Sequence, residues 1–332
     1  MTSDKCRLRE AFAGRAAAVP FFEEVIEQRP AKAVLGRAVG GDTRRMAVAD
    51  HVELAQRLGL DAVAAHTGGW LGGGTYAEAS DGSTHYVGGA AGAGEELVAE
   101  PFDPGEAREA VRRYVEGARG TGIGVMAWLP GIITGPAIAL GYEALALALH
   151  DAPKMIEQAC DLQLTRTSQA LAAAVEAGAD FVAMGDDISD RNGPMMTPEM
   201  LRQLWLERAQ TITAEARRRS IPIMLHCCGH LGAVLPLAIA AGFDALQPVA
   251  GCNDVPAILA QARGRITVAG TVDVGSVLVR GTPDQIREVV REHWGAYGPK
   301  GFVIGSNHSL NDAVPGANVR ALAAAVAELR GG

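Results

Sequence analysis

The chain has 332 residues, of which 48% are hydrophobic and 20% charged, and its net charge is −8. This composition supplies a large core and excludes a disordered chain, and the acidic balance without a dense basic block excludes nucleic acid as the main partner. No apolar run reaches the roughly 18 residues of a membrane span, and the N-terminus lacks the apolar core of a secretory signal, so we expect no membrane association. Five cysteines without framework spacing favour a reducing, cytoplasmic location.

Strand-like and helix-like segments alternate along the chain. The expected strands are 33–35, 62–65, 123–128, 181–184, 221–226, 244–247, 266–269 and 302–304. The expected helices are 47–58, 106–119, 155–177, 197–219, 231–241, 255–261, 283–294 and 318–329. Thr197 and Thr282 each precede a proline and are the expected N-caps of their helices. About eight β-then-α units predict an α/β fold, a (β/α)₈ TIM barrel, as one domain over 1–332 with a helical extension at 1–30.

Residues 68–96 interrupt this rhythm because they are too long and too rich in glycine for an ordinary connection. Two glycine clusters flank residues 75–87, and His85-Tyr86-Val87 is expected to form a short strand there. Glycines permit the backbone changes of a hinge, so the segment is predicted to be a lid over the barrel mouth. A rigid hairpin, or a contact in a homodimer, is the alternative.

The motif Leu225-His226-Cys227-Cys228 stands where an expected strand ends. Side chains alternate along a strand, so Met224, His226 and Cys228 should face the barrel interior or its mouth. Barrel enzymes place their chemistry at this end, and imidazole plus thiolate is a natural pair for Zn²⁺. The alternative is that Cys228 is a small buried apolar residue and His226 a hydrogen-bonded core residue.

Polar residues follow several other expected strands. Asp186 and Asp187 follow 181–184 and are candidate catalytic acids, although a capping role is the alternative. His308, after the last strand, is a candidate third metal ligand, with Cys252 or Asp187 as the fallback. That loop could instead bind an anion through its backbone N–H groups. The candidate substrate-binding residues are His66, Trp70, Gln247, Asp273 and Asn307.

Four segments, in order and spacing, resemble the uroporphyrinogen decarboxylase superfamily, whose members are TIM barrels. They are GDDISDRNGPMMTPEMLRQLW, IPIMLHCCGHLGAVLPLAIAAGFDALQPV, ITVAGTVDVGSVLVRGTPDQIREVV and FVIGSNHSLNDAVPGANVRAL, and AVPFFEEV and LAQRLGLDAVA match more loosely. Decarboxylases of the superfamily carry an arginine-rich N-terminal motif and an early aspartate. This chain has Val19-Pro20-Phe21-Phe22 and His66-Thr67-Gly68 there, which disfavours porphyrinogen decarboxylation.

The chain is most similar to the zinc-dependent, cobalamin-linked methyltransferases of that superfamily. His226 and Cys228 match their H-x-C motif, whereas no cysteine follows Cys252 and His308 falls near the place of the later metal-binding cysteine. The resemblance implies one Zn²⁺ per chain and methyl transfer between a corrinoid carrier and a small thiol or related acceptor. The chain has no D-x-H-x-x-G corrinoid motif, so methylcobalamin would arrive on a separate protein.

Two other functions stay open at this point. One is a lyase acting on a small carboxylated substrate, with Asp186 or Asp187 as acid or base. The other is a barrel that binds a small-molecule ligand without turnover.

Overall fold

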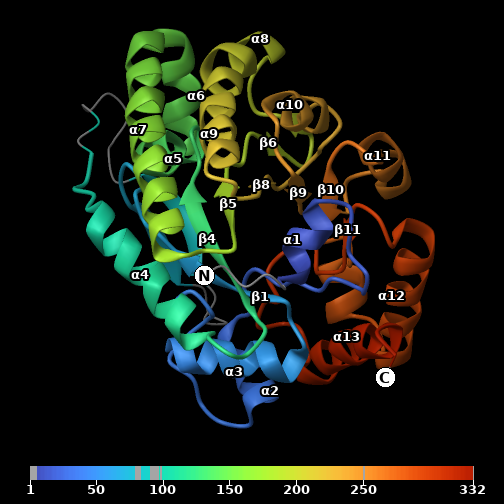
Figure 1. Ribbon diagram of the computed structural model, residues 1–332. Coiled ribbons are helices and arrows are strands. Elements are labelled where there is room, and N and C mark those ends of the chain that lie inside the picture. The colour runs from blue at the N-terminus through green and yellow to red at the C-terminus, as the bar shows by residue number, and fades with distance from the viewer. Residues whose placement is uncertain (1–5, 79–83, 90–96, 98, 250, 332) are drawn as a thin grey trace.

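The computed structural model describes residues 6–78, 84–89, 97, 99–249 and 251–331. Its centre is a parallel sheet in the order β1-β4-β5-β8-β9-β10-β11. These strands are β1 (Ala62–His66), β4 (Gly124–Pro130), β5 (Phe181–Gly185), β8 (Ile223–His226), β9 (Ala245–Gln247), β10 (Thr267–Ala269) and β11 (Phe302–Val303). Helices surround the strands (Figure 1), and the α/β barrel fold predicted from the sequence is confirmed.

A short N-terminal segment, residues 20–22, joins the two edges of this sheet. The Phe22 N–H donates to the Ile304 carbonyl at 3.1 Å, and the Ile304 N–H donates to the Pro20 carbonyl at 3.0 Å. On the other side, the Asp61 N–H donates to the Phe21 carbonyl at 2.9 Å. The first strand position of the barrel therefore lies inside the region that was expected to be only a helical extension.

The strand predicted at 33–35 is wrong, because these residues end helix α2 (Gln28–Leu35). Ala31 and Leu35, four residues apart, are both buried, which is the spacing of one helix face. A three-residue apolar run cannot distinguish this pattern from a strand.

The two faces of β8 have different surroundings, as predicted. Ile223 and Leu225 belong to the outer core between strands and helices, whereas Met224 lies in the barrel interior. Several of the strand side chains that line the interior are small, namely Ala62, Ala64, Ala183, Ala245 and Ala269. Helix α1 (Arg7–Phe12) fills the remaining space of the barrel interior from its amino-terminal end. In Figure 1 this helix is seen in projection among the barrel strands. The Phe12 ring meets Phe181 edge-on at 5.3 Å between centroids.

The remaining helices form the outer layer. They are α3 (Val48–Leu58), α4 (Pro104–Gly117), α5 (Thr134–Leu140), α6 (Tyr142–Asp151), α7 (Pro153–Ala177), α8 (Pro198–Met200), the π-helix η1 (Leu201–Leu206), α9 (Glu207–Arg218), α10 (Val234–Ala241), α11 (Val255–Ala262), the π-helix η2 (Val274–Val279), α12 (Pro283–Tyr297) and α13 (Gly316–Leu329). The predicted N-caps are confirmed: Thr197 accepts the Met200 N–H at 3.2 Å, and Thr282 forms a capping box with Gln285. None of the helices in the described part of the chain is long and apolar enough to cross a membrane.

The glycine-rich segment contains the expected hairpin, formed by β2 (Gly74–Glu78) and β3 (Thr84–Gly89). The Tyr86 hydroxyl lies within hydrogen-bonding distance of two α5 carbonyls, those of Ala137 at 3.3 Å and Ile138 at 3.2 Å, and donates its one proton to this pair. Residues 79–83 and 90–96, which include Gly92 and Gly94, lie outside the described residues. Closure of this hairpin as a lid stays a prediction. A second, two-residue hairpin, β6 (Ser189–Asp190) with β7 (Gly193–Pro194), follows β5.

Candidate metal centre

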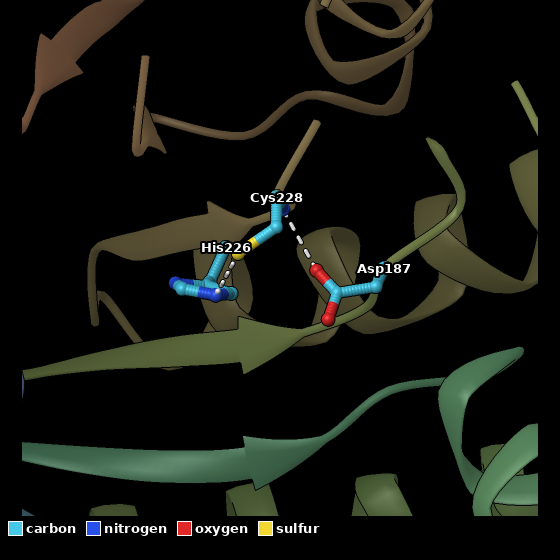
Figure 2. A group of neighbouring side chains, drawn as sticks. All are labelled: Asp187, His226 and Cys228. Atoms are coloured by element: carbon cyan, nitrogen blue, oxygen red, sulfur yellow. Dashed lines mark hydrogen bonds between the residues drawn. The ribbon is translucent and has the colours of Figure 1, made fainter. Parts of the chain in front are cut away.

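Three potential ligands meet at the carboxyl end of β5 and β8 (Figure 2). His226 is the last residue of β8, Cys228 follows it by two residues, and Asp187 follows the end of β5 by two. Gly185 pairs with His226 in the sheet, so the two strand ends lie at the same level. The ligand atoms of the three side chains all lie within 4.8 Å of one another. We call this set the Asp187–His226–Cys228 cluster.

Hydrogen bonds hold the cluster together. The Cys228 Sγ lies 3.3 Å from His226 Nε2, and the Cys228 backbone N–H donates to Asp187 Oδ1 at 2.7 Å. The Asp187 N–H donates in turn to the Thr134 hydroxyl at 2.7 Å, which attaches this loop to α5. The cluster is therefore arranged by backbone bonds as well as by its side chains.

The imidazole and the thiol stabilise each other's charged forms. Burial alone would lower the pKa of His226, but the Glu24 carboxylate and Cys228 raise it well above its usual value. Burial alone would raise the pKa of Cys228, but His226 and a hydrogen bond from His308 bring it below its usual value. These contacts thus favour the Cys228 thiolate, the form that binds metals, more than in a free cysteine.

Glu24 is a site residue that the sequence analysis missed. Its Oε2 lies 2.9 Å from His226 Nδ1, and Gln247 Oε1 lies 2.6 Å from the same nitrogen. The available signal was position, because Glu24 comes two residues after the segment 20–22 that closes the barrel. Because the first strand was predicted at 33–35, Glu24 was not recognised as a residue at a strand end.

A cavity of about 570 Å³ opens beside the cluster. Its walls include Asp187 and Cys228 from the cluster, and Asn307, His308 and Cys252 from the two other loops singled out in the sequence. His308 is exposed, and its hydrogen bond with the Cys228 thiol raises its own pKa. The structure thus brings His308 to Cys228, but the tight three-residue set contains Asp187 in its place.

The two neighbouring aspartates have different surroundings. Asp186 is fully buried, and its carboxylate accepts the N–H groups of Ile132, Ile133 and Thr134 at 2.7–2.9 Å and the Trp205 indole N–H at 2.8 Å. Burial raises its pKa to about 6 against the effect of these donors. Asp186 therefore ties the loop after β4 and the π-helix η1 together, whereas Asp187 faces the cavity.

The other predicted substrate-binding residues, His66, Trp70, Gln247 and Asp273, do not belong to the cavity walls. The His66 ring lies tilted against Trp128, with 5.9 Å between the ring centroids. Its buried Nε2 has no hydrogen-bond partner among the described residues, and burial lowers the pKa of His66. Trp70 packs against the barrel interior cluster. Asp273 caps η2 through Ser276 and accepts the Asn307 side-chain amide at 2.8 Å. Gln247, as described above, bonds to His226.

The donor set fits a zinc ion. One imidazole nitrogen, one thiolate and one carboxylate oxygen are all common zinc ligands. Zn–S and Zn–N bonds of about 2.3 and 2.0 Å at a tetrahedral angle place the two ligand atoms about 3.5 Å apart. The observed 3.3 Å between Cys228 Sγ and His226 Nε2 is close to that separation. Three protein ligands leave a fourth position for a small molecule.

Comparison with known proteins gives a decisive family match. Residues 98–329, well over half of the chain, match the uroporphyrinogen decarboxylase (URO-D) family. The chain belongs to this family. The match includes the strands β4 to β11 and all three residues of the Asp187–His226–Cys228 cluster.

Among curated relatives of this URO-D family member is the methylcobamide:CoM methyltransferase MtaA of Methanosarcina barkeri, 27% identical over 133 residues. That match spans 40% of this chain and 38% of the relative. A methylcobamide:CoM methyltransferase MtaA from Methanosarcina barkeri (strain Fusaro / DSM 804) is 31% identical over 93 residues, 28% of this chain and 26% of the relative. The chain thus matches less than half the length of these relatives.

Two solved structures share the fold. A methyltransferase from Methanosarcina mazei superposes with a TM-score of 0.76 at 21% identity, covering 99% of each chain. A B12-independent methionine synthase from Shewanella sp. W3-18-1 superposes with a TM-score of 0.57 at 14% identity, covering 85% of this chain and 87% of that chain. At these identities the likeness establishes the barrel architecture.

Proposed function

We propose that this chain is a methyltransferase that moves a methyl group between a corrinoid carrier protein and a small thiol or related acceptor. We further propose that Asp187, His226 and Cys228 hold a zinc ion for this reaction. The observation that carries the proposal is the convergence of these nitrogen, sulfur and oxygen donors at the carboxyl end of a URO-D barrel. The similarity to methylcobamide:CoM methyltransferases over part of the chain supports the reaction type.

Each residue has a separate task in this proposal. His226, Cys228 and Asp187 supply the ligand atoms, and the Cys228 N–H orients the Asp187 carboxylate. When bound, Zn²⁺ would keep an acceptor thiol deprotonated near neutral pH. The cavity of about 570 Å³ admits a small acceptor beside Cys228, with Asn307 and His308 in its walls. Since the chain carries no corrinoid motif, the methyl donor would approach from the open mouth of this cavity.

The test is incubation of the zinc-loaded chain with methylcobalamin and a panel of small thiols. We expect the visible spectrum to show loss of the methyl group from the cobalamin, with formation of a thioether. Cys228→Ser should abolish the reaction. Cys160→Ser is the control, because it replaces a thiol of helix α7 that belongs neither to the cluster nor to the cavity walls. No demethylation with any thiol would contradict the proposal and favour decarboxylation of a small carboxylated substrate, with Asp187 as its acid or base.

A further inference from the structure

The Glu24 carboxylate lies behind the Asp187–His226–Cys228 cluster, on the side away from Cys228. It comes from the residue pair that follows the barrel-closing segment 20–22. Its side chain is 15% exposed, and that of His226 is 13% exposed, so solvent screens their contact little. Glu24 Oε2 lies 2.9 Å from His226 Nδ1, while His226 Nε2 faces the Cys228 sulfur at 3.3 Å. The two nitrogens of one ring thus face opposite partners.

The chemistry of these partners decides which nitrogen carries the proton. An ionised carboxylate only accepts hydrogen bonds, and the Gln247 side-chain oxygen, 2.6 Å from the same Nδ1, also accepts. Nδ1 must therefore be the donor. A metal ion at the cluster would displace the second proton of the ring, the one on Nε2, and the neutral imidazole that keeps its proton on Nδ1 would direct the Nε2 lone pair at the cluster. Without an acceptor behind the ring, the proton could occupy Nε2 and block that lone pair.

We propose that Glu24 is the positioning residue of the metal centre, fixing the tautomer and the ring orientation of His226. The inference rests on the metal part of the proposed function. Partners of this kind, which bond to a ligand rather than to the metal, typically change metal affinity by about 10–100-fold. We therefore expect Glu24→Gln, which keeps the shape but loses the charge, to weaken zinc binding by about 10–100-fold.

The test is a competition between the chain and a chromophoric chelator for zinc, without methyl donor or acceptor. The matched control is Glu23→Gln, the same substitution one residue earlier. The Glu23 carboxylate bonds to Ser306 and not to the cluster, so this variant should bind zinc as the unaltered chain does. The double variant Glu24→Gln with Gln247→Glu returns a carboxylate to Nδ1 and should recover most of the lost affinity. A purely structural role for Glu24 predicts no such recovery.

Equal zinc affinity of Glu24→Gln and the unaltered chain would overturn the inference while leaving the proposed function standing. Tight, Glu24-dependent zinc binding without methyl transfer would support the inference about Glu24 and contradict the proposed methyl transfer. If Glu24→Gln does not fold, nitrogen NMR of the zinc-loaded, unaltered chain labelled at histidine gives the same answer. We expect a protonated Nδ1 and a metal-bound Nε2 at His226, and the opposite assignment would overturn the inference.

Discussion

The two ends of the barrel hold their acidic groups in contrasting ways. At the amino-terminal end, Asp61 pairs with Arg7 and with Arg330, the latter at 2.7 Å, and accepts the Phe21 N–H at 2.7 Å. Helix α1 covers this end. At the carboxyl-terminal end, Asp187 and Cys228 lie beside a cavity, and hydrogen bonds and one imidazole, rather than arginines, hold them.

The difference separates a structural carboxylate at the amino-terminal end from groups suited to binding at the carboxyl-terminal end. Two guanidinium groups satisfy the Asp61 carboxylate, so that end needs no ligand. The groups at the other end are of metal-ligating type and adjoin open space, as is usual where barrel proteins bind and react. Removing groups from the two ends should therefore have different consequences, and the following variants test this.

The largest effect on stability is expected at the carboxyl-terminal end, where the neighbouring residues Asp186 and Asp187 should respond differently to replacement by alanine. Asp186→Ala leaves three backbone N–H groups and the Trp205 indole without their acceptor. We expect a loss of about 3–5 kcal/mol in the free energy of unfolding. Asp187→Ala should cost less than about 1 kcal/mol but lose zinc affinity. Urea unfolding and zinc content measure the two effects, and similar destabilisation by both variants would contradict this division.

At the amino-terminal end, Asp61→Ala removes a carboxylate from two arginines and from the Phe21 N–H. We expect a loss of about 2–4 kcal/mol in unfolding free energy, because a partly buried ion pair is broken rather than replaced. Zinc content of the folded protein should be unchanged. Loss of zinc in a variant that remains folded would show that the two ends are coupled.

A smaller, pH-dependent effect is expected at Glu23, next to Glu24. Burial raises the pKa of Glu23 to about 8, whereas an unfolded glutamate titrates near about 4.3. The Ser306 hydroxyl lies within hydrogen-bonding distance of both Glu23 and the His308 carbonyl, and its single proton serves only one of them. A protonated Glu23 supplies the second.

The folded state therefore binds this proton more tightly than the unfolded state. The resulting stability is fully present below about pH 4 and is lost as the pH rises through about 8. The free energy of unfolding of the unaltered chain should therefore fall between pH 5 and pH 8.5 by at least about 1 kcal/mol more than that of Glu23→Gln, which carries no titrating group at this position. Urea unfolding at the two pH values measures the difference, and parallel profiles would refute the assignment.

The smallest effect is expected at the hairpin beside the cavity. Tyr86 meets Tyr142, a cavity-wall residue, edge-on at 5.8 Å. Tyr86→Phe removes the hydroxyl bond to α5 and should loosen the hairpin by about 0.5–1.5 kcal/mol. Limited proteolysis should then cleave within 68–96 faster, and the lid prediction adds that methyl acceptor slows this cleavage. Equal resistance with and without acceptor would favour a rigid hairpin.

Much of the barrel could be predicted because its strands are apolar and are separated by periodic helices. The outward Ile223 and Leu225 and the inward Met224 follow from alternation alone. The first strand position could not be predicted, because 20–22 is short and contains a proline. Its pairing with Ile304, the residue after β11, spans nearly the whole chain, and local sequence carries no signal for such a contact.

The candidate site, like the barrel, could be predicted from the sequence only in part. His226 and Cys228 share one strand end, so their proximity follows from local spacing. The meeting of Cys228 with Asp187 depends on the sheet register between β5 and β8, which sequence spacing does not define. Asp186 and Asp187 were equivalent in sequence, and only the burial of one carboxylate and the exposure of the other to the cavity distinguishes their surroundings.

X-ray absorption at the zinc edge, with elemental analysis of the same tag-free protein, tests the central claim most directly. The Asp187–His226–Cys228 cluster predicts one zinc per chain, with a single sulfur at about 2.3 Å and nitrogen or oxygen in the other positions. His226→Ala should remove that signal. Less than about 0.2 zinc per chain, unchanged by His226→Ala, would contradict the metal centre. A spectrum with two sulfur ligands would contradict the assignment of Asp187.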